Sequence, residues 1–301
     1  MNRVLEVEKT RKGPPPFAGI AASVGAVLLA CTAFSAPAAA GTVEAGFTNL
    51  GTVTRCDDCA TSRIATNFTL NFFGNSYSGF YISNNGYLTF QSGQGTYTPS
   101  GLGAGYVGQP IIAPFFADVD TRPAAGGTVT YGTGSYAGRD AYGVTWNSVG
   151  YYNQQIDKTN TFQALLVNRS DLATGDFDIY FNYDRVLWET GSASGGVGGF
   201  GGVPAAAGFN AGTGNAPGTF FELAGSRQTR AFEDNGSNPL IRQTNDGTPG
   251  QYLFQVRAGI VVVAPPSPGA VPEPSTWAMM VFSFGAIGGM LRRRRTSYVL
   301  A

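Results

Sequence analysis

The stretch DFDIYFNY, residues 176–183, decides the fold class of this chain. Its apolar side chains occupy every second position, and Asp176 and Asp178 alternate with them. Successive side chains of a β-strand point to opposite faces of the sheet. The pattern therefore predicts a strand with one face in the core and the other face, which carries both aspartates, in solvent. The apolar set is Phe177, Ile179, Phe181 and Tyr183.

Similar patterns recur along the chain after residue 41. Residues 143–149, GVTWNSV, alternate in the same way. Asn85-Gly86 lies between two β-rich runs within residues 81–90, which is the strongest short-range signal of a β-hairpin. Short strands joined by glycine and asparagine turns predict an all-β domain, built as an antiparallel sandwich or barrel-like sheet. Further strands are expected at 64–73, 111–117, 160–167 and 251–263.

The first 40 residues have the features of a helical signal peptide. Basic residues precede an apolar run, and small residues then offer a cleavage site for signal peptidase between Ala40 and Gly41 after Sec export. Residues 28–31, Leu-Leu-Ala-Cys, offer an alternative, because they loosely resemble a lipobox in which Cys31 would be lipidated. The Ala-x-Ala site favours ordinary cleavage.

The other end of the chain carries VPEPSTWAMMVFSFGAIGGMLRRRR, residues 271–295. Residues 277–291 contain no charge, and as a helix they would span roughly 22 Å. A bilayer core is about 30 Å thick, so the predicted transmembrane helix is short for a permanent anchor. A permanently anchored single-pass protein remains the alternative. Trp277 suits one interface, and the cytoplasmic side would hold Arg292, Arg293, Arg294 and Arg295.

The C-terminal segment contains a Pro-Glu-Pro motif, an apolar run and an arginine cluster, in this order. It resembles the PEP-CTERM sorting signal of Gram-negative bacteria. The resemblance covers residues 272–295 and rests on Pro272, Glu273, Pro274 and Trp277 followed by the arginines. It implies an exosortase as partner, cleavage near the Pro-Glu-Pro motif, transient insertion in the inner membrane, and a secreted or cell-surface product in a biofilm setting. The Pro-rich linker at 264–271 would present this site as an extended segment.

Charge and composition exclude several functions for the span between these two signals. Residues 41–271 contain 11 arginines and lysines against 16 acidic residues, a net charge of −5. Nucleic-acid binding relies on basic patches, so it is not expected here. The chain has no histidine, which excludes a Ser-His-Asp triad and a histidine-based zinc site. No catalytic residue is predicted.

Two pairs of residues are candidates for a structural or metal site. Cys56 and Cys59, in the sequence Cys-Asp-Asp-Cys, predict a disulfide in an oxidising exterior, since no βαβ context favours thioredoxin-like exchange. Asp118 and Asp120 flank Val119 at the end of an apolar strand. With a third carboxylate and backbone carbonyls they could bind Ca²⁺. Two alternatives are a glycosidase acid/base pair, and turn capping in which Arg122 pairs with one aspartate.

The central part of the chain resembles the nidogen-like (NIDO) domain of extracellular proteins. This resemblance implies a β domain at 41–263, with its core match at 80–212, that serves as a non-catalytic matrix or adhesion module. Its expected partner is an extracellular polysaccharide or matrix protein. The alternative from another class is an exported carbohydrate-active enzyme assisted by Ca²⁺. The matching runs are 82–90, 110–122, 143–152, 160–167, 178–191 and 206–212.

Overall fold

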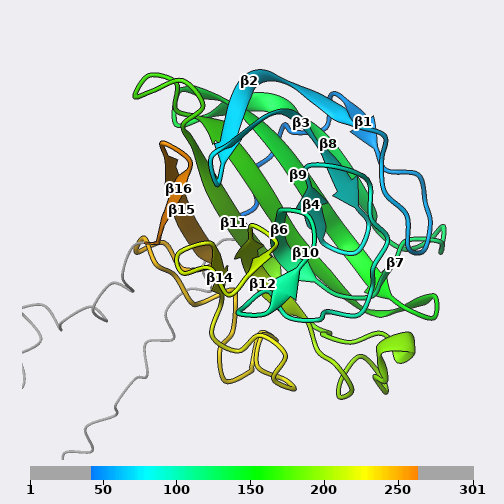
Figure 1. Cartoon of the computed structure of the whole chain (residues 1–301). Coiled ribbons are helices and arrows are strands. Elements are labelled where there is room, and N and C mark those ends of the chain that lie inside the picture. Colours follow the sequence, from blue (N-terminus) through cyan, green and yellow to red (C-terminus); the bar gives the residue numbers. More distant parts are fainter. Residues whose placement is uncertain (1–41, 264–301) are drawn as a thin grey trace, which may run out of the picture. The chain divides into compact units, whose positions relative to one another are not determined.

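A computed structural model describes residues 42–263 of the chain (Figure 1). Within this range there are sixteen strands and one 3₁₀ helix of three residues, η1 (Ser192–Ser194). All strand pairs are antiparallel. Neither of the two main sheets of this part closes on itself. The all-β prediction is confirmed, as a sandwich of open sheets.

The larger sheet has eight strands and forms the broad layer in Figure 1. β9 and β10 at its centre are the longest strands, with 13 and 14 residues. β7 (Val119–Asp120) lies off the main path and pairs with the end of β9. The path runs through β1 (Gly51–Thr52), β8 (Thr128–Tyr136), β9 (Arg139–Tyr151), β10 (Gln155–Asn168), β11 (Phe177–Arg185), β15 (Gln251–Arg257) and β16 (Ile260–Val263).

The second sheet has six strands and covers one face of the first (Figure 1). A separate two-stranded pair joins β5 (Tyr106–Val107) and β13 (Thr213–Gly214). The six-stranded path runs through β14 (Phe220–Glu222), β12 (Ala206–Asn210), β6 (Ile111–Phe116), β4 (Tyr87–Thr89), β3 (Asn75–Ser83) and β2 (Ile64–Phe72).

Aromatic side chains join the two sheets across the core. Phe115 of β6 lies 5.2 Å from Phe162 of β10, measured between ring centroids, and Phe162 stacks on Trp146 of β9 at 5.0 Å. Phe209 of β12 meets Phe254 of β15 edge-on at 5.2 Å. Such rings bury large apolar areas and prefer these offset or edge-to-face geometries, so they fix how the sheets pack.

Residues 177–183 of the predicted strand lie in β11, but its second face is also buried. The four apolar side chains lie in the main core, which confirms the predicted inner face. The expected solvent face is wrong, because Asp176 is only 4% and Asp178 only 3% exposed. Asp178 forms ion pairs with Arg169 and Arg257, and Asp176 accepts a hydrogen bond from the backbone of Ala258. These interactions replace the hydrogen bonds to water that the two aspartates lose on burial.

The N-terminal segment 42–48 covers part of the outer face of the eight-stranded sheet. Phe47 packs there on Ala141, Leu165 and Val167 in a second, smaller core. The Thr42 hydroxyl donates to the carbonyl oxygen of Gly250 at 2.9 Å. We call residues 42–48 the cover segment.

The predicted hairpin at 81–90 is confirmed as β3 and β4, with Asn84-Asn85-Gly86 between them. Gly86 has φ = +83°, and a Cβ there would overlap the carbonyl oxygen of Phe115. Glycine is therefore required for both conformation and space. Asn84 and Asn85 are fully buried, so this turn lies inside the domain.

The other predicted strands appear with small differences at their ends. β2 and β6 end one residue earlier than expected, and β9 and β10 extend beyond the predicted runs. Residues 251–263 form two strands, because the chain reverses at Ala258-Gly259 between β15 and β16. The predicted signal peptide (1–40), linker (264–271) and transmembrane helix (277–291) lie outside the described residues. Between residues 42 and 263, no helix has the length and apolar character to cross a membrane.

Candidate functional site

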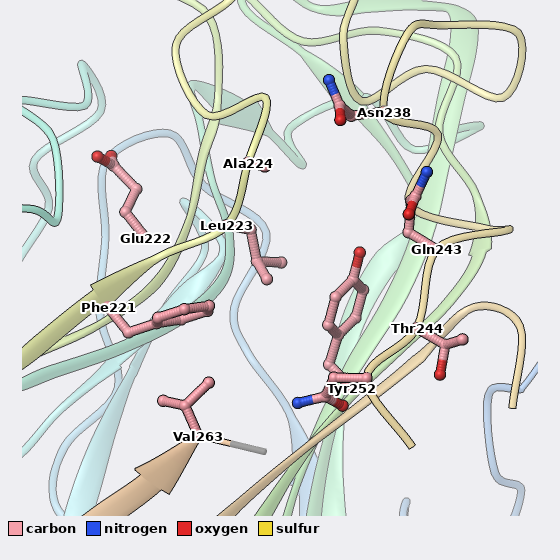
Figure 2. A pocket seen from close by; sticks show the side chains of 10 residues that line it. Phe221, Glu222, Leu223, Ala224, Asn238, Gln243, Thr244, Tyr252 and Val263 are labelled. Atoms are coloured by element: carbon pink, nitrogen blue, oxygen red, sulfur yellow. The ribbon is translucent and has the colours of Figure 1, made fainter. Parts of the chain in front are cut away.

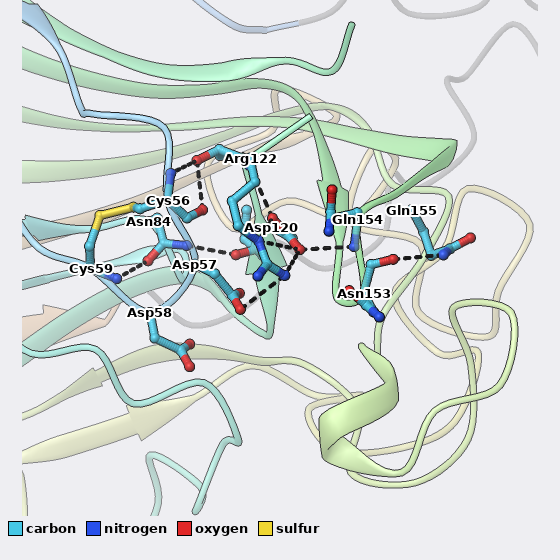
Figure 3. A network of polar contacts seen from close by, with 12 residues as sticks. Cys56, Asp57, Asp58, Cys59, Asn84, Asp120, Arg122, Asn153, Gln154 and Gln155 are labelled. Carbon is cyan, nitrogen blue, oxygen red and sulfur yellow. Dashed lines mark hydrogen bonds and ion pairs between the residues drawn. A yellow bond between two sulfur atoms is a disulfide. The ribbon is translucent and has the colours of Figure 1, made fainter. Parts of the chain in front are cut away.

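A disulfide joins Cys56 and Cys59 in the loop between β1 and β2, with their Cα atoms 6.0 Å apart (Figure 3). The loop is fixed on two sides. The backbone N–H of Cys56 donates to the Thr121 hydroxyl at 3.0 Å. The backbone N–H of Cys59 donates to Asn84 Oδ1 at 2.9 Å. The disulfide therefore anchors this short loop, with its two aspartates, between β7 and the buried hairpin turn.

The buried hairpin turn also holds β7 in place. Asn84 Nδ2 donates to the carbonyl oxygen of Val119 at 2.6 Å, and Asn85 Oδ1 accepts the Val119 N–H at 2.9 Å. Asn85 Nδ2 donates to Asp58 Oδ1 at 2.9 Å. Two asparagine side chains thus bring the loop at 56–59 together with the strand that follows Asp118.

Asp120 is fully engaged by hydrogen-bond donors (Figure 3). Arg122 Nε lies 2.9 and 3.1 Å from its two carboxylate oxygens, and the backbone N–H of Gln154 donates to Oδ2 at 2.8 Å. Burial raises the pKa of Asp120, but the hydrogen bonds from Arg122 and from the backbone of Gln154, together with the charge of Arg122, outweigh this effect and hold the pKa below its ordinary value. Arg122 also pairs with Asp57 Oδ2 at 3.2 Å.

Asp118 faces a different set of neighbours from Asp120. Its side chain belongs to a group with Asp57 and Asp58, in which one carboxylate oxygen from each residue lies within 4.8 Å of the other two. We call these three residues the acidic cluster. Asp118 is 1% exposed, and its Oδ2 has no hydrogen-bond partner within the described structure. The predicted pair of Asp118 and Asp120 is thus divided between two environments.

Burial and mutual repulsion raise two pKa values in the acidic cluster. Burial, and then the charges of Asp57, Asp58 and Asp120, raise the pKa of Asp118 to about 7. Burial, and then the charges of Asp120 and Asp58, raise the pKa of Asp57 to about 6. Asp57 and Asp58 were not predicted from the sequence as neighbours of Asp118. Their position between two cysteines was a usable signal, because a disulfide orients the residues that it encloses.

A separate cavity of about 360 Å³ lies beside Tyr252 (Figure 2). Phe221 and Val263 stand at one end of it, and the Tyr252 hydroxyl points toward the end that carries Asn238 and Gln243. We call it the Tyr252 pocket. Aromatic walls with a few polar groups are typical of small-ligand sites. The remaining lining residues are Glu222, Leu223, Ala224, Thr244 and Asn245.

An antiparallel β-sandwich with a disulfide-held loop is typical of extracellular domains. The sequence matches the nidogen-like domain over residues 78–138 and 132–258, and the chain therefore belongs to this family. Residues 270–295 match the PEP-CTERM protein-sorting motif, which contains the predicted sorting residues Pro272, Glu273, Pro274 and Trp277 and the four arginines. The structure does not describe these residues. Both resemblances inferred from the sequence are confirmed.

Curated relatives resemble this chain over its folded part. Alpha-tectorin of Gallus gallus is 30% identical over 224 residues, which are 67% of this chain and 10% of that protein. Alpha-tectorin of Homo sapiens is 32% identical over 224 residues, which are again 67% of this chain and 10% of that protein. Nidogen of Drosophila melanogaster is 30% identical over 209 residues, 62% of this chain and 14% of that protein. The match thus covers a small part of each relative. No solved structure matches the chain.

Proposed function

We propose that this chain is an exported, non-catalytic matrix or adhesion protein that an exosortase processes. The observation that carries the proposal is the PEP-CTERM motif at 270–295, which follows a nidogen-like domain. In this scheme signal peptidase cleaves between Ala40 and Gly41. The helix at 277–291 holds the chain in the inner membrane until the exosortase cleaves near Pro272–Pro274. The product is secreted or displayed on the cell surface.

The partner that we propose outside the cell is an extracellular polysaccharide or a matrix protein. The Tyr252 pocket supports a saccharide, because its aromatic ring and the amides of Asn238 and Gln243 offer an apolar surface and hydrogen-bonding groups together. The names of the relatives, alpha-tectorin and nidogen, agree with an extracellular setting.

The competing function, a carbohydrate-active enzyme, has less support from the geometry. A glycosidase needs two carboxyl groups that reach the scissile bond from a cleft. Asp118 is buried, and Asp120 is occupied by Arg122 and by the backbone of Gln154. Hydrolysis of polysaccharide that is lost in Asp118→Asn, with folding retained, would favour the enzyme.

Intact mass and terminal peptide mapping of the protein from cells and from medium test the proposed processing. We expect an extracellular species that begins at Gly41 and ends near Pro272–Pro274. A membrane-bound species that still carries residues 292–301 as the final product would refute the sorting scheme. It would leave the permanently anchored single-pass protein as the better description.

A further inference from the structure

The acidic cluster concentrates three carboxylates with little compensating charge. One oxygen from each of Asp57, Asp58 and Asp118 lies within 4.8 Å of the other two. Among residues 42–263, one guanidinium pairs with the cluster, that of Arg122 with Asp57. Asp120 adds a fourth negative charge nearby, but its main partner is Arg122, with which it forms an ion pair. Like charges at this spacing repel, and burial strengthens the repulsion because it lowers the local dielectric.

The three carboxylates are nevertheless held in fixed orientations. Arg122 binds Oδ2 of Asp57, Asn85 donates to Oδ1 of Asp58, and Gly191 packs on the carboxylate of Asp118. Two buried oxygens of the cluster have no hydrogen-bond partner among residues 42–263, Oδ1 of Asp57 and Oδ2 of Asp118. Hydrogen bonds to one part of a carboxylate that leave another oxygen available are the usual way in which proteins orient metal ligands.

A buried carboxylate oxygen without a hydrogen-bond partner destabilises the folded state. Of the two residues with such an oxygen, Asp118 is the more deeply buried. Its side chain is 1% exposed, so bulk water does not compensate it. A Cβ on Gly191 would overlap this carboxylate, which means that the loop before η1 packs directly on it. A buried polar group of this kind calls for a compensating ligand.

The geometry points to a binding site for one Ca²⁺ ion formed by Asp57, Asp58 and Asp118. Two oxygens that bind one Ca²⁺ at roughly 2.3–2.6 Å lie at most about 5 Å apart, so the spacing within the cluster is compatible with one shared ion. All three ligands are hard oxygen donors, which favour Ca²⁺ over zinc or copper. Asp58 is exposed, so the ion can enter and complete its shell with water on that side.

Calcium is a better fit than magnesium at this site. Mg²⁺ demands near-octahedral geometry at about 2.0–2.1 Å, whereas Ca²⁺ accepts irregular shells of six to eight oxygens. Here three donors come from a disulfide loop and from the residue before β7, and water must supply the rest of the shell. The site differs from the pair expected from the sequence, because Asp57 and Asp58 take the place of Asp120.

Calorimetric titration of the full chain with CaCl₂, purified under oxidising conditions and freed of metal with a chelator, tests this site. We expect one Ca²⁺ per chain, with a Kd of roughly 10⁻⁵–10⁻³ M, and a rise in the melting temperature. Asp58→Asn should weaken binding at least tenfold, and this exposed side chain can change with little risk to folding. Asp118→Asn should abolish binding. Asp184→Asn, which removes an exposed charge from β11, is the matched control and should bind as the wild type does.

Three outcomes would overturn the assignment. The first is a wild-type protein that shows no heat of binding and the same melting temperature in chelator and in 5 mM CaCl₂. The second is unchanged Ca²⁺ affinity in both Asp58→Asn and Asp118→Asn. The third is equal affinity for Mg²⁺, which would show that the donors do not select a large ion. If the proposed exosortase processing does not occur, the calcium test is unaffected, because all three ligands lie within residues 57–118, far from the sorting motif in the sequence.

Discussion

Substitution of Asp118 by asparagine should stabilise the metal-free protein, although it removes a buried native side chain. The pKa of Asp118 rises from 3.8 to about 7 on folding, so the folded state binds the proton more tightly than the unfolded state. Stability from this group is therefore lost as the pH rises from about 4 to about 7, and the full penalty is present at pH 8. An asparagine carries no charge and escapes that penalty.

The size of the effect follows from the pKa difference. Each pKa unit is worth about 1.36 kcal/mol, so the difference between 3.8 and about 7 sets an upper limit of about 4 kcal/mol. Water that enters from the exposed Asp58 side reduces the repulsion, and we expect about 1–3 kcal/mol of added stability. The new amide can also donate to the neighbouring carboxylates of Asp57 and Asp58.

Asp120→Asn is the matched opposite case. Asp120 accepts hydrogen bonds from Arg122 and Gln154, and its pKa lies below the ordinary value, so its charge stabilises the fold above pH 4. An asparagine would lose the ion pair and leave a guanidinium without its main partner. We expect a loss of about 2–4 kcal/mol.

Urea unfolding at pH 8 in excess chelator, followed by the fluorescence of the buried Trp146 and Trp188, measures both variants. The expected result is a higher midpoint for Asp118→Asn and a lower midpoint for Asp120→Asn, with unchanged slopes. If both variants lose stability equally, the Asp118 charge is already compensated in the metal-free protein, and the predicted destabilisation by this charge is refuted.

Three further predictions concern pH, the core and the Tyr252 pocket. Saturating Ca²⁺ should raise the melting temperature more at pH 8 than at pH 5, because protons on Asp118 and Asp57 compete with the ion at the lower pH; an equal rise at both would contradict this. Phe162→Ala should lower the unfolding free energy by about 3–5 kcal/mol in urea, against less than about 0.5 for the exposed Leu172→Ala. Gln243→Ala should reduce retention on polysaccharide columns without changing the melting temperature; unchanged retention would exclude the Tyr252 pocket.

Local alternation was sufficient to predict β9 and β11, because every second side chain of these strands is buried on the same face, whereas β8 was not predicted. It was not sufficient at Asp176 and Asp178. Their burial depends on Arg169, on Arg257 and on the turn at Ala258, which the fold brings together from distant parts of the chain. A pattern with a period of two residues carries no information about such partners.

Only part of the candidate site could be predicted, because the proximity of its residues also depends on contacts between distant parts of the chain. The sequence singled out Asp118 as a calcium ligand and Cys56–Cys59 as a pair, but it did not connect them. Their meeting depends on Asn84 and Asn85, which bridge the disulfide loop and Val119. The Asn-Gly signal predicted the turn correctly, yet turns usually lie on the surface, so its burial could not be anticipated.

The cover segment also has a consequence for the order of events during export. Thr42 bonds to the carbonyl oxygen of Gly250, 208 residues further along the chain, just before β15 begins. Contacts between such distant residues form late, because the intervening chain must first be available and ordered. The first residues of the domain therefore cannot dock until nearly the last of its strands is present. In the proposed route of export through Sec, the domain would therefore complete its fold only after nearly all of it has crossed the membrane.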